Sequence, residues 1–376
     1  QRASDIHLEP RREMGLIRFR IDGVLHTVYQ LPPTVLAAMT SRIKLLGRMD
    51  VVEKRRPLDG RIKTRNPAGE EVEMRLSTLP TAFGEKMVMR IFDPDTAVKD
   101  LSMLGFTPHD AERWENLVKQ PHGIILVTGP TGSGKTTTLY TALQTINTPE
   151  RKILTVEDPV EYQLEGVNQI QVKPQINLTF ANALRAIVRQ DPDVIMIGEM
   201  RDLETAGIAV QSALTGHLVL STLHTNDAAG SVTRLLDMGM EDYLLTSTIN
   251  GILAQRLVRL LCSRCKQPYQ ALPELIEEMR LHRFADGRDI TLYKPVGCEH
   301  CGGTGYRGRA AIMEFLVMSD PLRRLVLKHA DAGDLQTTAQ KEGMDTMYED
   351  GLRKAVAGLT TIEEVLRVTT QQEQEA

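Results

Sequence analysis

One short segment of the chain has the residue types and the spacing of a site for a nucleoside triphosphate. GPTGSGKT at 129–136 fits the pattern G-x-x-x-x-G-K-[ST] in full, between an apolar stretch and a predicted helix. Its glycines let backbone N–H groups converge on an anion, and the helix start adds a positive dipole end. Lys135 would place its charge on the β- and γ-phosphates, and the Thr136 hydroxyl would be a ligand of Mg²⁺. We predict that ATP contacts Gly129, Pro130, Thr131, Gly132, Ser133, Gly134, Lys135, Thr136 and Thr137.

Two carboxylates follow apolar stretches that are typical of buried strands. Glu157 follows ILTV, and Glu199 follows VIMI and a glycine. Since such strands would end near the phosphates, we expect Glu199 to hold Mg²⁺ through water and Glu157 to activate the attacking water as general base. Each could instead cap a helix or pair with an arginine, an alternative that is stronger for Asp158 and Glu161.

Two histidines stand at the ends of a third apolar stretch. TGHLVLSTLHTND at 215–227 has His217 at the start and His224 at the end of this stretch. If it is the next strand of the same sheet, His224 approaches the γ-phosphate, where it could distinguish triphosphate from diphosphate. We also predict His217 as catalytic, although a structural histidine is an equally good interpretation.

Four cysteines form two C-x-x-C pairs, Cys262 with Cys265 and Cys298 with Cys301. Four thiolates suit a closed, tetrahedral, structural Zn²⁺ site. The first residues, QRASDIHLEP, are unlike a secretion signal, which argues for metal rather than for disulfides. Disulfides, an iron–sulfur cluster and free thiols are the alternatives. We predict a four-cysteine zinc module at 256–312.

Length and composition limit the function classes. The 376 residues suggest two or three domains, the net charge is −4, and aromatic residues make up 4%. These values argue against a basic nucleic-acid coat and against base-stacking platforms. No apolar run approaches the ~18 residues of a membrane-spanning helix. Because the sequence begins with Gln1, we expect that a further segment precedes it.

The predicted elements at the amino end form a small α+β domain, residues 1–97. The segments LIRFRI and VLHTVYQL alternate and are joined by an Asp-Gly turn, and a helix is predicted from the following Pro-Pro pair to Arg48. Further strands are predicted at 61–65, 71–77 and 85–92, and the segment DPD at 93–95 closes the domain.

The rest of the chain predicts a different architecture after a linker at 98–106. From 107 to 255, continuous apolar strands alternate with helices, which indicates a doubly wound α/β core. With the family resemblance described next, we expect this core to be a RecA-like P-loop ATPase domain. From about Gly251 onwards we predict helices that the cysteine pairs interrupt. A helical carboxy-terminal subdomain is predicted at 313–376, with a frayed tail.

Ordered motifs along the chain resemble those of one family. GPTGSGKTTTLY, TVEDPVEY, LRAIVRQDPDVIMIGEMRD and ALTGHLVLSTLHTND resemble the phosphate loop, aspartate box, metal-binding strand and histidine box of the secretion ATPase superfamily. SDIHLEP, FRIDGVL, KRRPLDGRI and MRLSTLPTAFGEKMVMRI resemble its amino-terminal domain. The resemblance implies an ATP-hydrolysing homo-hexamer on the cytoplasmic face of the bacterial inner membrane. It also implies that a preceding domain docks on inner-membrane platform proteins, so that membrane association is peripheral.

The resemblance is closest to the assembly members of that superfamily, because the retraction ATPases lack the four-cysteine element. NDAAGSVTRLLDMGMEDYLL, ILAQRLVRLLC and MYEDGLRKAVAGLTTIEEVLRVT are more similar to the type II secretion ATPase than to the type IV pilus assembly ATPase. This implies a motor for pseudopilus assembly and protein export, with pilus extension as the alternative. A nucleic-acid translocase is a remote alternative without a basic channel or aromatic stacking residues, and we expect no nucleic-acid partner. A nucleotide switch without turnover would not need the complete set of catalytic side chains.

The developing charge on the γ-phosphate needs a cation besides the loop lysine, and P-loop motors often take it from another domain. Arg61 and Arg75 lie in the amino-terminal segments that match the family, and we predict them as catalytic. The alternative is that they belong to a solvated sheet face. Further candidates are Arg55 and Arg90 in the same domain and Arg185, Arg189 and Arg201 in the core, of which Arg201 could simply pair with nearby acids.

Overall fold

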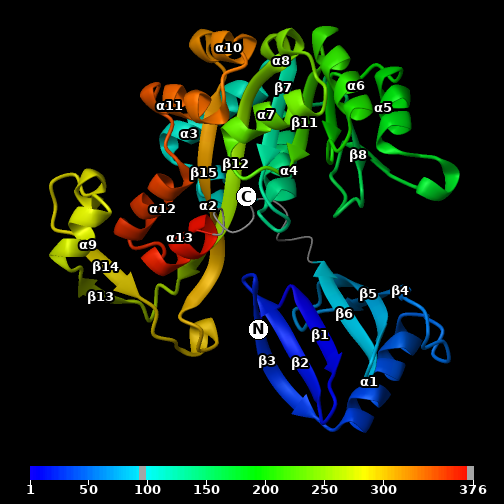
Figure 1. Ribbon diagram of the computed structural model, residues 1–376. Helices are drawn as coiled ribbons and strands as arrows, with labels where there is room; N and C mark the ends of the chain where they lie inside the picture. Colours follow the sequence, from blue (N-terminus) through cyan, green and yellow to red (C-terminus); the bar gives the residue numbers. More distant parts are fainter. Residues whose placement is uncertain (93–98, 371–376) are drawn as a thin grey trace. The chain divides into compact units, whose positions relative to one another are not determined.

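The structure, a computed structural model, describes residues 1–92 and 99–370. The chain divides into two compact units, residues 1–97 and residues 98–376 (Figure 1). Each unit has its own sheet and its own hydrophobic core. The predicted closing segment at 93–95 and the predicted frayed tail at 371–376 lie outside the described residues.

The amino-terminal unit is a six-stranded sheet with one helix on one face. The strand order is β3-β2-β1-β6-β5-β4, and all neighbouring strands are antiparallel. Helix α1, Pro33–Leu46, packs Leu36 against a core that includes Leu8, Leu76 and Met87. The predicted strands and helix are present, and β1 is a strand that the sequence analysis missed. The strands are β1 Asp5–Pro10, β2 Gly15–Ile21, β3 Val24–Leu31, β4 Leu58–Arg65, β5 Glu71–Thr81 and β6 Gly84–Phe92.

The larger unit is built on a seven-stranded sheet in the order β15-β12-β7-β11-β10-β8-β9. All neighbouring strands are parallel except the edge strand β15, which runs antiparallel to β12. Every residue of β7, β8, β10 and β11 is buried, as their continuous apolar runs predict. The strands are β7 Gly123–Thr128, β8 Ile153–Glu157, β9 Asn168–Gln171, β10 Val194–Ile197, β11 Leu218–Leu223, β12 Ile249–Leu261 and β15 Tyr306–Val317.

Helices cover both faces of this sheet, so the unit is a mixed α/β fold of the doubly wound type (Figure 1). On one face, residues of α2, α3 and α4 share a hydrophobic core with Ile125 and Val127 of β7. On the other face, residues of α5, α6 and α7 share a core with Ile124 and Leu126. Part of the predicted linker is therefore helical. The helices are α2 Leu101–Leu104, α3 Pro108–Val118, α4 Lys135–Ile146, α5 Phe180–Val188, α6 Leu203–Leu214, α7 Ala228–Asp237 and α8 Asp242–Thr248.

The prediction of helices from about Gly251 onwards is wrong for β12 and β15, which form a long antiparallel pair. Strand β12 is buried on both faces, so its apolar residues do not alternate. Periodicity alone cannot distinguish such a run from a buried helix. The predicted helical region at 313–376 likewise begins inside β15. The helices that follow are α10 Asp320–Leu327, α11 Ala332–Lys341, α12 Met347–Val356 and α13 Ile362–Thr369.

Between β12 and β15 the chain leaves the sheet and forms a small lobe at 262–305. The predicted module at 256–312 therefore also includes residues of the main sheet. The core of the lobe, with Leu281 and Leu292, packs against Leu352 of α12 and Val365 of α13. Its elements are β13 Gln267–Gln270, α9 Pro273–Glu278 and β14 Thr291–Lys294.

Candidate active site

The predicted phosphate loop connects the carboxyl end of β7 to the first turn of α4. Gly134 caps the helix in the left-handed conformation, with a φ of 85°. Gly129 lies against β12, because a Cβ there would be 2.5 Å from the backbone oxygen of Gln255. Backbone geometry and space thus require glycine at these two positions. Thr131 and Gly132 between them are exposed, so this part of the loop faces solvent.

Lys135 reaches back across the loop that precedes it. Its ammonium donates to the carbonyl oxygens of Gly129 at 2.6 Å and Pro130 at 3.1 Å, and it lies 3.5 Å from His224 Nδ1. Burial lowers the pKa of Lys135 to about 8, although Glu199 acts in the opposite direction. The cation is therefore held inside the loop, and a large part of its charge is lost above pH 8.

A series of polar contacts continues from Lys135 to the residues that follow β10 and β11. His224 Nε2 lies 2.9 Å from Glu199 Oε1, and Arg201 donates to Glu199 Oε2 at 2.7 Å. With His224 donating from Nε2, its Nδ1 becomes the acceptor that faces the ammonium. Burial would raise the pKa of Glu199, but Arg201, His224 and Lys135 together lower it. The structure thus brings together three residues that were predicted from separate motifs.

Glu157, the last residue of β8, is buried and held on both carboxylate oxygens. Tyr140 of α4 donates to Oε1, while Thr155 donates to Oε2 at 2.7 Å and Gln169 at 3.1 Å. Burial, with the adjacent carboxylate, raises the pKa of the Tyr140 phenol, which therefore remains a donor. These contacts fix Glu157 between β8, β9 and the helix that begins at the phosphate loop.

The residues predicted to hold magnesium, Thr136 and Glu199, share one pocket with the predicted general base, Glu157. Thr136, Glu157 and Glu199 line it together with Asp158 and Glu161. These side chains offer hydroxyl and carboxylate oxygens, which are the donors that Mg²⁺ prefers. The residues present therefore fit a magnesium ion beside the phosphate loop.

The structure separates His217 from this pocket. His217 precedes β11 at its amino end, where Nδ1 lies 2.8 Å from the carbonyl oxygen of Ser212. His224 follows the opposite end of the same strand, seven residues and therefore about 23 Å away at roughly 3.3 Å per residue. Within this chain, the described contacts of His217 are those of a structural histidine, which is the alternative interpretation that the sequence left open.

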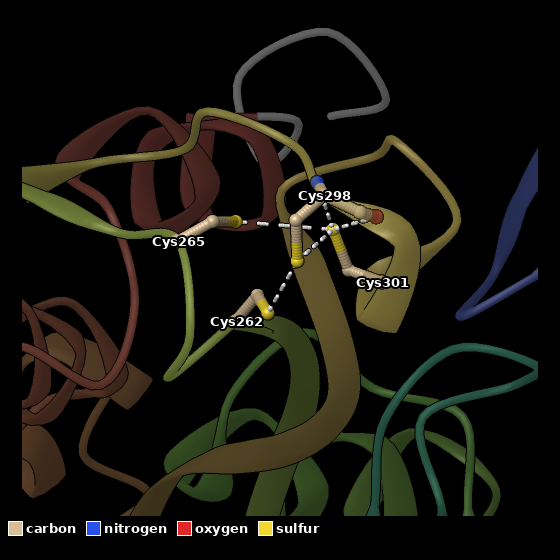
Figure 2. A group of neighbouring side chains, drawn as sticks. All are labelled: Cys262, Cys265, Cys298 and Cys301. Carbon is tan, nitrogen blue, oxygen red and sulfur yellow. Dashed lines mark hydrogen bonds between the residues drawn. The ribbon is translucent and has the colours of Figure 1, made fainter.

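The four cysteines converge at the base of the lobe, with their sulfur atoms directed toward one another (Figure 2). The sulfur atoms of Cys262 and Cys298 are 3.8 Å apart, those of Cys265 and Cys301 are 3.9 Å apart, and all four lie within 4.8 Å of one another. A tetrahedron with Zn–S bonds of ~2.3 Å has sulfur–sulfur edges of about 3.8 Å, so the cluster fits one Zn²⁺. All four cysteines are free thiols in the structure, so none of them forms the disulfide that was one alternative.

Backbone donors around the sulfur atoms favour the thiolate form that binds metal. Gly297 N–H donates to Cys265 Sγ at 3.3 Å, and the N–H groups of Cys298 and Gly305 donate to Cys301 Sγ at 3.2 Å each. Burial opposes ionisation of Cys301, but these donors and the neighbouring thiols lower its pKa. The peptide groups around the cluster are thus arranged for negatively charged sulfur.

In the amino-terminal unit, the predicted catalytic arginines occupy adjacent strands in direct register. Arg61 of β4 is opposite Arg75 of β5, and Arg75 is opposite Arg90 of β6. Their side chains lie on the face that α1 does not cover, because the adjacent residues Ile62, Leu76 and Met89 belong to the core under α1. Arg75 lies over the Phe92 ring at 4.2 Å, and Arg90 pairs with Asp5 at 2.9 Å. Arg61 is exposed.

Most of the remaining arginine candidates are paired with carboxylates. Arg55 lies 3.5 Å from Glu53, and Arg185 pairs with Glu204. Arg201 pairs with a site carboxylate, as described above. Arg189 is exposed at the end of α5.

Two polar residues that organise the site were not predicted as site residues, although both lie in segments that resemble the family, GPTGSGKTTTLY and ILAQRLVRLLC. Tyr140 contacts Glu157 from α4, and Gln255 of β12 contacts the phosphate loop. Apart from its place in that segment, Gln255 is marked only as an uncharged polar residue inside an apolar run. Its role becomes visible when the run is seen to be a strand beside β7.

A phosphate loop between a central parallel strand and a helix, with acidic strand ends and a histidine beside it, defines a P-loop nucleotide-binding protein. Within that class, residues 1–367 match the family described as Type II/IV secretion system protein, and the chain belongs to this family.

Similar proteins agree with this assignment. The chain is 61% identical over 368 residues to the type II secretion system protein E of Xanthomonas campestris pv. campestris, covering 98% of this chain and 65% of the relative. It is 53% identical over 371 residues to the type IV pilus assembly ATPase TfpB of Acinetobacter baylyi, covering 98% and 63%. The chain thus spans less than two thirds of either relative. A crystal structure of the pilus retraction motor PilT with bound ADP aligns over 99% of this chain and 94% of that chain, with a TM-score of 0.64 and 27% identity.

Proposed function

We propose that this chain is the ATP-hydrolysing part of a type II secretion motor that drives pseudopilus assembly and protein export. The observation that carries the proposal is the contact series from Lys135 through His224 to Glu199, at 3.5 and 2.9 Å, beside a complete phosphate loop. A protein that only bound nucleotide would not need this arrangement. The 61% identity to a type II secretion system protein E supports the choice of machinery.

The side chains divide the work of hydrolysis as follows. Lys135 would neutralise the β- and γ-phosphates, and Thr136 with Glu199 would hold Mg²⁺, which supplies further positive charge beside the phosphates. Glu157, which is held by its three donors, would act on the attacking water as general base. His224 bridges the lysine and the metal-side carboxylate, so it can respond to loss of the γ-phosphate.

The proposed assembly is a homo-hexamer at the cytoplasmic side of a bacterial inner membrane, docked on platform proteins through a segment that precedes this chain. No helix in residues 1–92 or 99–370 has the length and apolar character to cross a bilayer. In this proposal residues 107–255 form the ATPase core, and the four cysteines bind a structural Zn²⁺ that ties the lobe at 262–305 to the sheet.

The amino-terminal unit would supply catalytic cations. Arg61 and Arg75 are cross-strand neighbours on the sheet face that α1 does not cover, and they are the proposed source of the cation that hydrolysis needs besides Lys135. Alanine at either position should lower turnover at least tenfold while nucleotide affinity changes little. Unchanged turnover in both variants would make this unit a spacer.

The motor proposal is tested by ATPase activity as a function of protein concentration. A cooperative rise indicates an assembly with shared sites, and Lys135→Ala should abolish hydrolysis at every concentration. Activity that appears only with DNA or RNA and falls steeply with salt would favour a translocase instead.

Type IV pilus assembly is the second candidate, favoured by 53% identity to TfpB. Chimeras separate the two functions, with this chain replacing the aligned part of each relative. The Xanthomonas chimera should restore protein export to a strain that lacks its own protein E. Restored piliation by the Acinetobacter chimera, without restored export, would favour the pilus motor.

A further inference from the structure

A buried glutamine outside the predicted site links the phosphate loop to the neighbouring strand. Gln255 is 1% exposed and comes one residue after Ala254, which pairs with Thr128 at the end of β7. We propose that Gln255 is a positioning residue, which holds the backbone of the loop in the orientation that binds phosphate. This inference rests on the proposed nucleotide-binding function and deepens it.

Both ends of the Gln255 amide are engaged. Nε2 donates to the carbonyl oxygen of Ser133 at 2.7 Å, and Oε1 accepts from the Thr138 hydroxyl at 2.9 Å. The carbonyl oxygen can only accept, so the amide nitrogen must be the group that faces it. The side chain therefore connects the last residues of the loop to the first turn of α4 in one fixed orientation.

The bond to Ser133 also sets the direction of the next N–H group. In a trans peptide the C=O and N–H vectors point in opposite directions. Because Gln255 holds the Ser133 oxygen toward β12, the Gly134 N–H points away from β12, toward the concave side on which such loops bind anions. Glycine tolerates many backbone conformations, so Gly134 alone would not select this one.

Packing against β12 restricts the loop further. A Cβ on Gly134 would lie 3.1 Å from Gln255 Nε2 and 3.3 Å from Leu257 Cδ2. A Cβ on Gly129 would lie 2.5 Å from the Gln255 backbone oxygen. The two ends of the loop are therefore shaped by one strand, and its motif glycines are needed partly because that strand is so close.

The first test is Gln255→Met, which keeps the length of the side chain and removes both hydrogen bonds. Without these bonds the Gly134 N–H is no longer held toward the phosphate, and the hydrogen bond to that charged group is lost. The affinity for ADP should therefore fall about 10- to 100-fold, as measured by titration with a fluorescent ADP analogue. Gln211→Met, the same change at an exposed position of α6, is the matched control and should stay within twofold of wild type. Wild-type affinity in folded Gln255→Met would overturn the inference alone, whereas a wild-type chain that binds no ADP would overturn the proposed function as well.

The second test, Gln255→Glu, examines whether a hydrogen-bond donor to the Ser133 oxygen is required. It also tests the inference if the methionine variant does not fold. A protonated glutamate has the shape of glutamine and can donate to the Ser133 oxygen, but an ionised one cannot. Burial raises the pKa of such a carboxyl. The ADP affinity of the variant relative to wild type at the same pH should be within threefold at pH 5.5 and at least tenfold lower at pH 8.5. A ratio that does not change with pH would overturn the inference.

Discussion

The affinity of this chain for ADP should fall about tenfold between pH 7 and pH 9 because Lys135 loses its proton. Burial lowers the pKa of Lys135 to about 8, with Glu199 opposing. With that pKa, the charged fraction in the free protein falls from about 90% at pH 7 to about 10% at pH 9. Bound phosphates favour the charged form, so binding above pH 8 must be accompanied by proton uptake. The affinity is therefore at its full value well below pH 8 and decreases as the pH rises.

Calorimetry can measure this proton directly. At pH 8, without Mg²⁺, titration with ADP in two buffers of different ionisation enthalpy should show an uptake of about half a proton per nucleotide. The phosphates of ADP are already ionised at that pH, so the proton goes to the protein. Lys135→Arg is the control, because a guanidinium stays charged and should give no uptake and a flat affinity from pH 7 to pH 9. Flat affinity and no proton uptake in the wild type would refute the reasoning.

Glu199→Gln should keep ATP affinity within about threefold and slow turnover at least about a hundredfold in a steady-state assay, since the carboxylate acts on metal or water; wild-type turnover would exclude it from catalysis. Glu157→Gln should behave similarly, and the more damaging of the two changes identifies the general base. Burial would raise the pKa of Glu364, but hydrogen bonds from Arg367 and Arg259 lower it from 4.5 to about 2. Glu364→Gln should therefore lower the free energy of unfolding by about 3 kcal/mol at pH 7, and urea unfolding should show this difference shrinking as the pH falls below 4.5; a difference that does not vary with pH would contradict the assignment. Cys298→Ser should reduce zinc from one ion per chain in elemental analysis and expose the lobe at 262–305 to protease before the sheet; iron, or no metal, in wild-type protein purified without chelator would contradict a zinc site.

The sequence was sufficient to predict those parts of the site whose spatial neighbours follow directly from the strand or helix beside them in the chain. The phosphate loop lies between a strand and a helix, and Glu157 and Glu199 lie at or just after strand ends, so spacing along the chain predicts their neighbourhood. Continuous apolar runs predicted the buried parallel strands for the same reason. His224 could be placed because its strand is the neighbour of β7.

Other parts depend on pairings between segments far apart in the sequence. Strand β12 was predicted as helix, because a strand buried on both faces has no alternating pattern. Gln255 therefore had no predicted neighbour, although it contacts Ser133 across 122 positions of sequence. The register that aligns Arg61 with Arg75 is likewise a property of the folded sheet.

The contact between Gln255 and the phosphate loop has a consequence for the timing of biosynthesis. The loop leaves the ribosome 122 residues before the glutamine that shapes it. At the usual 5–20 residues per second, this is a delay of roughly 6 to 24 seconds. During that interval the nascent chain contains the whole nucleotide-binding motif but lacks the strand against which the motif takes its form. A chain released in that interval would match the motif in sequence and have little affinity for nucleotide.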